Sequence, residues 1–327
     1  MGAAAALVTV GDALAAAVAR LAAAGVPEPR ADAEVLLARA LDTTRVGLVV
    51  AARRPLPETA ARDFAALVAR RAAREPLPYI VGEREFWSLP LAVDRRVLVP
   101  RPETELVVET ALRLAPAARR VLDVGTGSGA IAAALARELP AARVCASDVS
   151  ADALAVARAN VARHAPGVAL VRGDLLAPFR AAAFDLVAAN PPYVTDAELG
   201  GLAPEVRDHE PRVALAAGPD GLAALGRLVA EAPRLLAPGG WLVVEVGAGQ
   251  APAARRLAEE AGAERRQAGR RGLGASEKRS ARSARAPDGP PAELDTGRYV
   301  RVEVVGDHAG IERVLALKLG GGGWTRS

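Results

Sequence analysis

Cysteine, lysine and aromatic residues are scarce in this chain of 327 residues. Cys145 is the single cysteine, which excludes an intramolecular disulfide and favours a reducing, intracellular environment. Only Lys278 and Lys318 are lysines among the 42 basic residues, and the rest are arginines. This ratio, beside the abundance of alanine, indicates genome base composition more than selection for phosphate binding.

The excess of positive charge is confined to one segment. The formal net charge is +4, but residues 265–285 contain eight basic residues against the single acid Glu277. The rest of the chain therefore carries a small net negative charge. For this reason the overall charge does not predict a nucleic-acid-binding surface.

Long apolar runs and clusters of metal ligands are also missing. The longest uncharged run, residues 124–136, is too short to span a membrane. The opening segment does not fit a signal peptide, because no basic residue precedes its apolar part and Asp12 interrupts it. Myristoylation would need Ser or Thr where Ala6 stands. No Cys or His cluster has ligand spacing, so no metal site is predicted. We expect a cytoplasmic protein without a membrane segment.

The first part of the chain has a helical hydrophobic pattern. Leu14, Val18 and Leu21 recur at the spacing of one helix face, and further such stretches follow. This pattern predicts an N-terminal helical bundle over residues 1–78. Short extended segments then predict a β-hairpin linker over residues 79–100.

The remainder alternates between strand and helix patterns. This alternation predicts an α/β domain over residues 101–320, built on a doubly wound, mostly parallel sheet. Residues 264–298 interrupt it with many Arg, Gly, Ser and Pro residues, which predicts a disordered basic insertion. Residues 321–327 are expected to form a flexible tail.

The segment VLDVGTGSGA, residues 121–130, combines an apolar strand with Gly125, Gly127 and Gly129. Glycines at this point allow a tight turn and the close approach of backbone to a ligand before a helix begins. A dinucleotide site and a purely structural turn also fit this segment alone.

Two acidic residues favour a methyl donor at this glycine loop. Asp148 ends the next predicted strand, where it can accept hydrogen bonds from a ribose diol. Asp123 stands two residues before the first glycine, where an anion would repel a pyrophosphate but could help to hold the cationic methionyl end of S-adenosylmethionine. In the segment VRGDLL, Asp174 could accept from an adenine amine and Leu175 could lie against its ring. Asp174 could equally cap the following segment.

The segment FDLVAANPPYV places Asn190, Pro191, Pro192 and Tyr193 where a core strand must stop. Methylation of a planar NH2 group is difficult, because its lone pair is delocalised. The Asn190 side-chain oxygen and the Pro191 carbonyl can accept the two hydrogens, and Tyr193 can supply a flat wall. Accepting both hydrogens also stabilises the positive charge that builds on nitrogen. These residues therefore predict a site that methylates a planar amino group.

Together these motifs resemble the class I S-adenosylmethionine-dependent methyltransferases and, more closely, the PrmC/HemK family. The similar blocks are GEREFWSLPLAV, LVPRPETELVVE, VLDVGTGSGAIAAALA, FDLVAANPPYV, HEPRVALAAGPDGL and LLAPGGWLVVEVG. Members of this family methylate the glutamine amide of the GGQ motif in peptide chain release factors. The resemblance implies a seven-stranded Rossmann-like sheet, S-adenosylmethionine as donor, S-adenosylhomocysteine as product and a helical bundle that recognises the release factor.

Carried over residue by residue, the resemblance implies three groups of site residues. The cofactor-binding residues would be Asp123, Gly125, Thr126, Gly127, Ser128, Gly129, Asp148, Asp174, Leu175 and Asn190. The catalytic residues would be Asn190, Pro191 and Tyr193. The substrate-binding residues would be Asn190, Pro191, Pro192 and Tyr193. The partner would be the GGQ loop of a release factor, with no direct nucleic acid required, and a monomer is expected.

Several alternatives stay open at this point. The same chemistry could act on a ribosomal-protein glutamine or on an exocyclic amine of RNA or DNA. A non-enzymatic binder that keeps the pocket, and a dinucleotide oxidoreductase, are less compatible with the complete set of motif residues. The sequence does not determine which release factor is preferred, what the segment 264–298 does, or which contacts Arg101 and Glu105 make.

Overall fold

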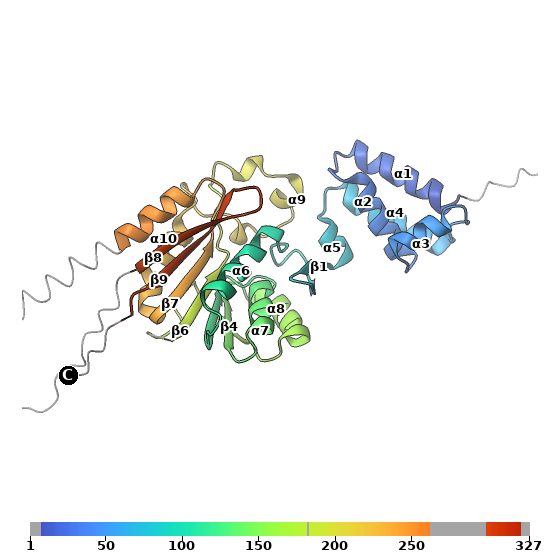
Figure 1. Cartoon of the computed structure of the whole chain (residues 1–327). Helices are drawn as coiled ribbons and strands as arrows, with labels where there is room; N and C mark the ends of the chain where they lie inside the picture. Colours follow the sequence, from blue (N-terminus) through green and yellow to red (C-terminus); the bar gives the residue numbers. More distant parts are fainter. Residues whose placement is uncertain (1–7, 182, 262–298, 322–327) are drawn as a thin grey trace, which may run out of the picture. The chain divides into compact units, whose positions relative to one another are not determined.

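A computed structural model describes residues 8–181, 183–261 and 299–321 of the chain (Figure 1). The insertion expected over residues 264–298 and the tail from residue 322 lie outside the described residues. The chain forms two compact units. Of the described residues, the first unit contains 8–83, 93–95 and 202–210, and the second contains 84–92, 96–181, 183–201, 211–261 and 299–321.

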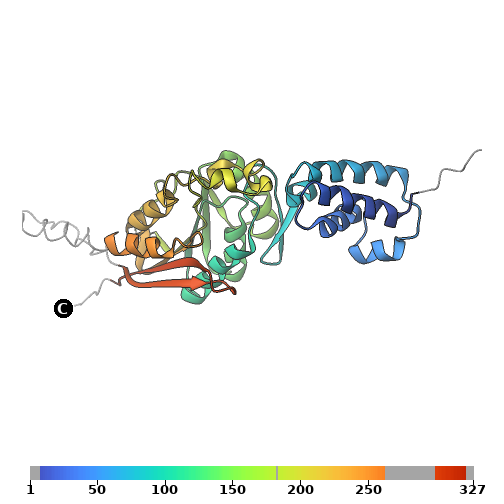
Figure 2. The same cartoon turned by 90° about the horizontal axis from the view of Figure 1, so that it is seen from above.

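The first unit is helical (Figure 2). Its helices are α1 (Val10–Ala23), α2 (Pro29–Ala40), α3 (Arg45–Ala51), α4 (Glu58–Ala72), α5 (Leu77–Val81) and α9 (Pro204–Arg207). At the start of α1, the Thr9 hydroxyl accepts from the Asp12 amide while the Asp12 carboxylate accepts from the Thr9 amide, which is a capping box. Leu21, Leu36 and Phe64 are buried between the helices, whereas Leu14 and Val18 of the predicted apolar face are partly buried.

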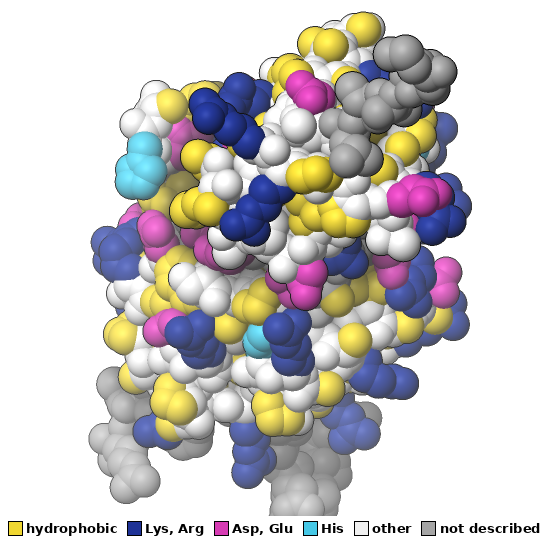
Figure 3. Space-filling model, turned by 90° about the vertical axis from the view of Figure 1, so that its right-hand side faces the viewer, with side chains coloured by type: hydrophobic (Ala, Val, Ile, Leu, Met, Phe, Trp, Pro, Cys, Tyr) yellow, Lys and Arg dark blue, Asp and Glu magenta, His cyan; other side chains and the backbone are white. Residues whose placement is uncertain are grey.

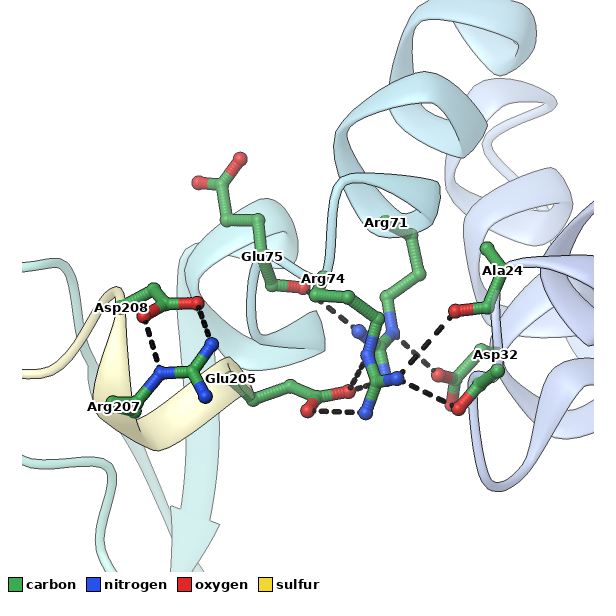
Figure 4. Close-up of polar contacts among 9 residues, drawn as sticks. Ala24, Asp32, Arg71, Arg74, Glu75, Glu205, Arg207 and Asp208 are labelled. Atoms are coloured by element: carbon green, nitrogen blue, oxygen red, sulfur yellow. Dashed lines mark hydrogen bonds and ion pairs between the residues drawn. The ribbon is translucent and has the colours of Figure 1, made fainter. Parts of the chain in front are cut away.

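Four charged residues, of which Asp32 and Arg71 are buried, form a network inside this unit. Arg71 on α4 donates to Asp32 on α2 at 2.7 Å and to Glu205 on α9 at 2.9 Å (Figure 4). Arg74 donates to both carboxylate oxygens of Glu205, at 2.7 and 2.6 Å. Burial alone would raise the pKa of Glu205, but hydrogen bonds from Arg74 and Arg71 hold it at about 2. These ion pairs attach the segment Leu202–Glu210 to the helices of the first unit.

The second unit contains a seven-stranded sheet with the order β5-β4-β3-β6-β7-β9-β8. Its strands are β3 (Arg120–Val124), β4 (Arg143–Asp148), β5 (Ala169–Arg172), β6 (Phe184–Ala189), β7 (Leu236–Glu245), β8 (Tyr299–Gly306) and β9 (Glu312–Leu319). The pairs among β3 to β7 are parallel, and β9 runs antiparallel to β7 and β8. The predicted doubly wound, mostly parallel α/β sheet is therefore confirmed, and it ends in an antiparallel hairpin of β8 and β9.

Helices cover both faces of this sheet (Figure 1). The helices of the second unit include α6 (Glu105–Leu114), α7 (Ala130–Glu138), α8 (Ala151–His164) and α10 (Ala223–Leu235), and residues 251–261 are also helical. Alternate strand residues point to opposite faces. Val121 thus packs in the layer of α6 and α7, while its neighbour Leu122 packs in the layer of α10.

The segment over residues 79–100 contains a smaller two-stranded sheet, β1 (Glu83–Phe86) and β2 (Leu89–Ala92). Its first residues differ from the expected extended pattern, because α5 continues to Val81. The Asn160 side chain on α8 accepts from the Ala92 amide at 2.7 Å and donates to the Ala92 carbonyl at 2.9 Å. These two bonds anchor β2 beside α8.

The surface that Figure 3 shows carries basic and acidic side chains side by side, with hydrophobic ones between them. This mixture is consistent with the small net charge of the chain outside residues 265–285. Among the described residues, no helix is long and apolar enough to cross a membrane.

Candidate active site

The loop between β3 and α7 has the backbone of a ligand-binding turn. Gly125, Gly127 and Gly129 have φ angles of 71°, 54° and 85°, in the left-handed region that favours glycine. A Cβ at Gly127 would meet no atom within 4 Å, whereas one at Gly129 would lie 3.4 Å from Ala157 on α8. The middle of the loop is therefore open, and its end packs against a helix.

Asp123 lies beneath this loop and is fully buried. Its Oδ2 accepts from the Thr126 hydroxyl at 2.6 Å and from the Ala132 amide at 3.1 Å. Burial raises the pKa of Asp123 to about 7. The two hydrogen bonds act in the opposite direction and lower the pKa, but their effect is smaller. In this position the carboxyl group fixes the turn from inside.

Asp148 ends β4 and faces the same loop. Its Oδ2 accepts from the Gly127 amide at 2.9 Å, and its Oδ1 accepts from the Ser150 amide at 2.9 Å. Each carboxylate oxygen has further acceptor capacity. Asp148 can therefore hold the loop and still bind two hydroxyl groups of a ligand.

Asp174 and Leu175 follow β5. Both carboxylate oxygens of Asp174 accept from Arg227 on α10, at 3.0 and 2.9 Å, so this acid is paired within the protein. Leu175 has a φ of 45°, which is unfavourable for a residue with a Cβ atom. Such backbone conformations concentrate at functional sites. Here it accompanies a leucine side chain that lines a cavity.

Asn190 to Tyr193 follow β6, as the prolines predict. The Asn190 Nδ2 donates to the Thr104 hydroxyl at 2.9 Å, and Thr104 in turn donates to Glu245 at 2.6 Å. The Tyr193 carbonyl accepts from the Gln250 side chain at 3.0 Å. Burial, followed by the charge of Glu245, raises the pKa of the Tyr193 hydroxyl to about 12. Tyr193 therefore stays protonated at neutral pH.

A cavity of about 350 Å³ joins these elements at the carboxyl ends of β3 to β6. This size is within the range of small-molecule sites, and the position is where ligands bind in open α/β sheets. Its lining includes many of the predicted site residues: Gly125, Gly127, Asp148, Asp174, Leu175, Asn190 and Pro192. Other predicted residues do not line it: Asp123, Thr126, Ser128, Gly129, Pro191 and Tyr193.

Sequence reasoning missed several residues around this cavity. Arg227 lines it and pairs with Asp174, while Thr104 and Glu245 form the hydrogen-bonded chain behind Asn190. The segment over residues 100–105 contributes Thr104 in this way, although Thr104 does not line the cavity. Glu105 instead accepts from the Trp87 amide at 2.8 Å. The LVPRPETELVVE block indicated this region of the sequence, but it did not indicate that Thr104 is the residue that bonds Asn190.

The buried Asp123 should make the protein less stable as pH rises. Its carboxyl has a pKa of about 7 in the folded chain and near 4 when unfolded. Between these values the folded state keeps a proton that the unfolded chain has released, so stability falls with increasing pH. We expect urea unfolding to show a loss on the order of 2 kcal/mol between about pH 5 and pH 8.

The Asp123→Asn variant should lose this contribution, whereas Glu245, whose pKa burial also raises to about 7, should cause a similar fall with pH in both proteins. An Asp152→Asn variant is the matched control, because Asp152 is an exposed carboxylate on α8. It should retain the wild-type slope. An Asp123→Asn protein with an unchanged slope would show that Asp123 is ionised throughout this range.

Comparisons with known proteins identify both parts of the chain. The PrmC N-terminal domain matches residues 12–82, and the methyltransferase small domain matches residues 102–203. The chain is 49% identical to the release factor glutamine methyltransferase of Geobacter sulfurreducens over 231 residues, which cover 71% of this chain and 81% of that protein. It is 48% identical to the protein of the same name from Moorella thermoacetica, over 79% of this chain and 92% of that one.

Among solved structures, the hMettl16 catalytic domain in complex with MAT2A 3'UTR hairpin 1 is similar with a TM-score of 0.50. Their sequences are 16% identical, and the match covers 77% of this chain and 80% of that one. At this identity the similarity supports the methyltransferase fold alone. The sequence matches over most of both chains are more specific, and they show that this chain belongs to the release factor glutamine methyltransferase family.

Proposed function

We propose that this protein transfers a methyl group from S-adenosylmethionine to the side-chain amide nitrogen of the glutamine in the GGQ motif of peptide chain release factors. The observation that carries this proposal is the position of Asn190. It follows β6 beside the cavity, and its amide nitrogen donates to Thr104, which leaves Oδ1 available as an acceptor. The names of the curated relatives support the choice of acceptor.

The cavity fits the methyl donor. Asp148 would accept from the ribose hydroxyls, and the open backbone at Gly125 and Gly127 would lie along the methionine part. Leu175 would pack against the adenine ring. Asp174 would contribute through its backbone, because its carboxylate is paired with Arg227. When bound, the donor supplies an electrophilic methyl group on a sulfonium centre.

The residues after β6 would position the glutamine amide. Asn190 Oδ1 and the Pro191 carbonyl would each accept one hydrogen of the NH2 group, and Tyr193 would form a wall for the planar amide. As the N–C bond forms and the S–C bond breaks, positive charge builds on the amide nitrogen, and these acceptors stabilise it. The nitrogen then loses one proton to water, which leaves a methylated amide and S-adenosylhomocysteine. Positioning and electrostatics supply the catalysis, so no strong general base is required.

The acceptor would be a release factor that this protein meets in the cytoplasm. Residues 12–82, which match the PrmC N-terminal domain, would recognise it. A ribosomal-protein glutamine and an exocyclic amine of RNA or DNA are the competing acceptors.

Transfer from tritiated S-adenosylmethionine to separate acceptors tests the proposal. The acceptors are a purified release factor, ribosomal proteins, bare tRNA and DNA, each incubated with the full-length protein. We expect label on the release factor alone. Label on nucleic acid but not on the release factor would overturn the acceptor and keep the chemistry. Absence of label on every acceptor, with S-adenosylhomocysteine still bound in calorimetry, would identify a binder without turnover.

Replacement of Asp148 by alanine should weaken S-adenosylhomocysteine binding by about 10- to 100-fold, the loss expected for hydrogen bonds to a charged group. Calorimetry with the ribose and 2′-deoxyribose forms of S-adenosylhomocysteine distinguishes two causes of weaker binding. One is the loss of a direct contact between Asp148 and the ribose, and the other is a change in the shape of the glycine loop. The wild-type protein should prefer the ribose form, and the variant should bind both equally. Asp63→Ala, which removes an exposed carboxylate on α4 that does not line the cavity, is the control and should bind normally. A variant that still prefers the ribose form would remove Asp148 from the ribose site.

A further inference from the structure

Asn190 is the first member of a chain of three polar side chains that leads away from the cavity. Its Nδ2 donates to the Thr104 Oγ1 at 2.9 Å, and Thr104 Oγ1 donates to the Glu245 Oε2 at 2.6 Å. Thr104 ends the short helix η1 (Pro102–Thr104), and Glu245 ends β7. Both are buried, and neither lines the cavity.

The sheet register brings Asn190 and Glu245, the two ends of this hydrogen-bonded series of side chains, close together. β6 and β7 are parallel neighbours in which Ala189 pairs with Val244. The next residues along the two strands are Asn190 and Glu245. Thr104 connects their side chains although it lies 86 and 141 residues away from them in the sequence.

Hydrogen-bond chemistry gives this chain a direction. A threonine hydroxyl has one hydrogen to donate, and an ionised carboxylate can only accept. When Thr104 donates to Glu245, its oxygen can only accept from Asn190. The Asn190 amide must then turn its nitrogen towards Thr104 and its Oδ1 away from Thr104.

We propose that Thr104 and Glu245 are positioning residues that hold Asn190 in the orientation in which Oδ1 accepts from the substrate amide. This inference rests on the role proposed above for Asn190. Without the hydrogen bonds to Thr104 and Glu245, the Asn190 side-chain amide could rotate by half a turn. It would then present its NH2 group to the NH2 group of the substrate glutamine. Two donors would then face each other, and the substrate nitrogen would lose the acceptor that stabilises its charge in the transition state.

The surroundings of Glu245 make its charge state sensitive to pH. Burial is the largest influence and raises the pKa of Glu245 to about 7. The Thr104 hydrogen bond and the charges of Arg313 and Arg101 oppose this rise, while Glu103 adds to it. Tyr193, whose pKa is also raised by Glu245, stays neutral in this range. A protonated Glu245 could donate to Thr104 and release the constraint on Asn190.

The test is the turnover of the Thr104→Val variant, which keeps the shape of the side chain and removes the hydroxyl. We expect kcat for release factor methylation to fall by about 10- to 100-fold, since misplacement of a catalytic group has this size of effect. The KM for the release factor and the affinity for S-adenosylhomocysteine should stay within about twofold of wild type. Thr104→Ser should restore turnover, because it keeps the hydroxyl.

Thr110→Val is the matched control. Thr110 is a second buried threonine, on α6, that does not line the cavity. Its replacement should leave kcat unchanged even if it lowers stability. Full turnover in Thr104→Val, with an active wild-type protein as reference, would overturn the positioning role alone. An inactive wild-type protein would instead overturn the proposed function.

A double variant tests whether Thr104 acts through Asn190. If it does, Thr104→Val should cause no further loss in an Asn190→Ala background, because the group that it positions is absent. Additive losses would show that Thr104 has a separate, structural role. Glu245→Gln supplies an independent measurement should Thr104→Val fail to fold. Its kcat should be reduced and should stay constant through about pH 7, where the wild-type kcat is expected to rise.

Discussion

Replacement of Asn190 by alanine should reduce kcat for release factor methylation by about 10²- to 10³-fold, the effect of removing one group that stabilises transition-state charge. In the proposed site, Asn190 Oδ1 is one of two acceptors for the amide hydrogens. The substrate nitrogen is a poor nucleophile, because its lone pair is delocalised into the carbonyl group. Without one acceptor, this nitrogen is less well aligned with the donor methyl group. The positive charge that develops on it is also less well stabilised.

The cofactor-binding step should survive this substitution. Asn190 is one of several residues around the cavity, and Asp148 and the glycine loop lie at the ends of other strands. The affinity of Asn190→Ala for S-adenosylhomocysteine, measured by calorimetry, should therefore change by no more than about threefold. Full turnover in this variant would remove Asn190 from the catalytic site. A parallel collapse of ligand binding would show that its role is to shape the cavity.

Replacement of Arg71 by methionine should destabilise the helical unit by about 3–5 kcal/mol, because it leaves a buried charge without its partner. Arg71 has 6% of its side chain exposed, and its guanidinium contacts both Asp32 and Glu205. Glu205 would keep Arg74, but the structure gives Asp32 no second basic partner among the described residues. Hydrogen exchange of peptides from α2 and α4 in the full-length protein should accelerate by about 100-fold or more.

Arg70→Met provides the control for this experiment. Arg70 is the preceding residue on α4 and pairs with Glu75, but 45% of its side chain is exposed. Surface ion pairs of this kind contribute about 1 kcal/mol or less, so exchange should change little. Adding Asp32→Asn to Arg71→Met should recover part of the loss by removing the unpaired charge. Equal hydrogen exchange rates in Arg70→Met and Arg71→Met would contradict the claim that the buried ion pair of Arg71 stabilises this unit more than the exposed ion pair of Arg70.

Features encoded by neighbouring residues could be predicted from the sequence. The alternation of strand and helix patterns is local, and it correctly predicted the mostly parallel sheet. The glycine loop and the proline-terminated strand are also local, so their residues could be located at the carboxyl ends of β3 and β6 before the structure was known.

Features that depend on contacts between distant residues could not be predicted. Glu205 joins the helical unit through arginines more than 130 residues away, which no hydrophobic periodicity encodes. Thr104 reaches Asn190 only because the fold brings η1 to the end of β6. The position of a carboxylate in the sequence also does not determine the direction in which its side chain points. Asp123 was expected to face the donor, and the structure places it beneath the glycine loop with Thr126.

Localisation of the transferred methyl group tests the central claim most directly. A release factor incubated with this protein and S-adenosylmethionine would be digested and analysed by tandem mass spectrometry. We predict one added methyl group on the side-chain nitrogen of the GGQ glutamine, and none when that glutamine is replaced by alanine. Methylation at another residue, or equal methylation of the alanine-substituted release factor, would contradict the assignment of the site beside Asn190 to a glutamine amide.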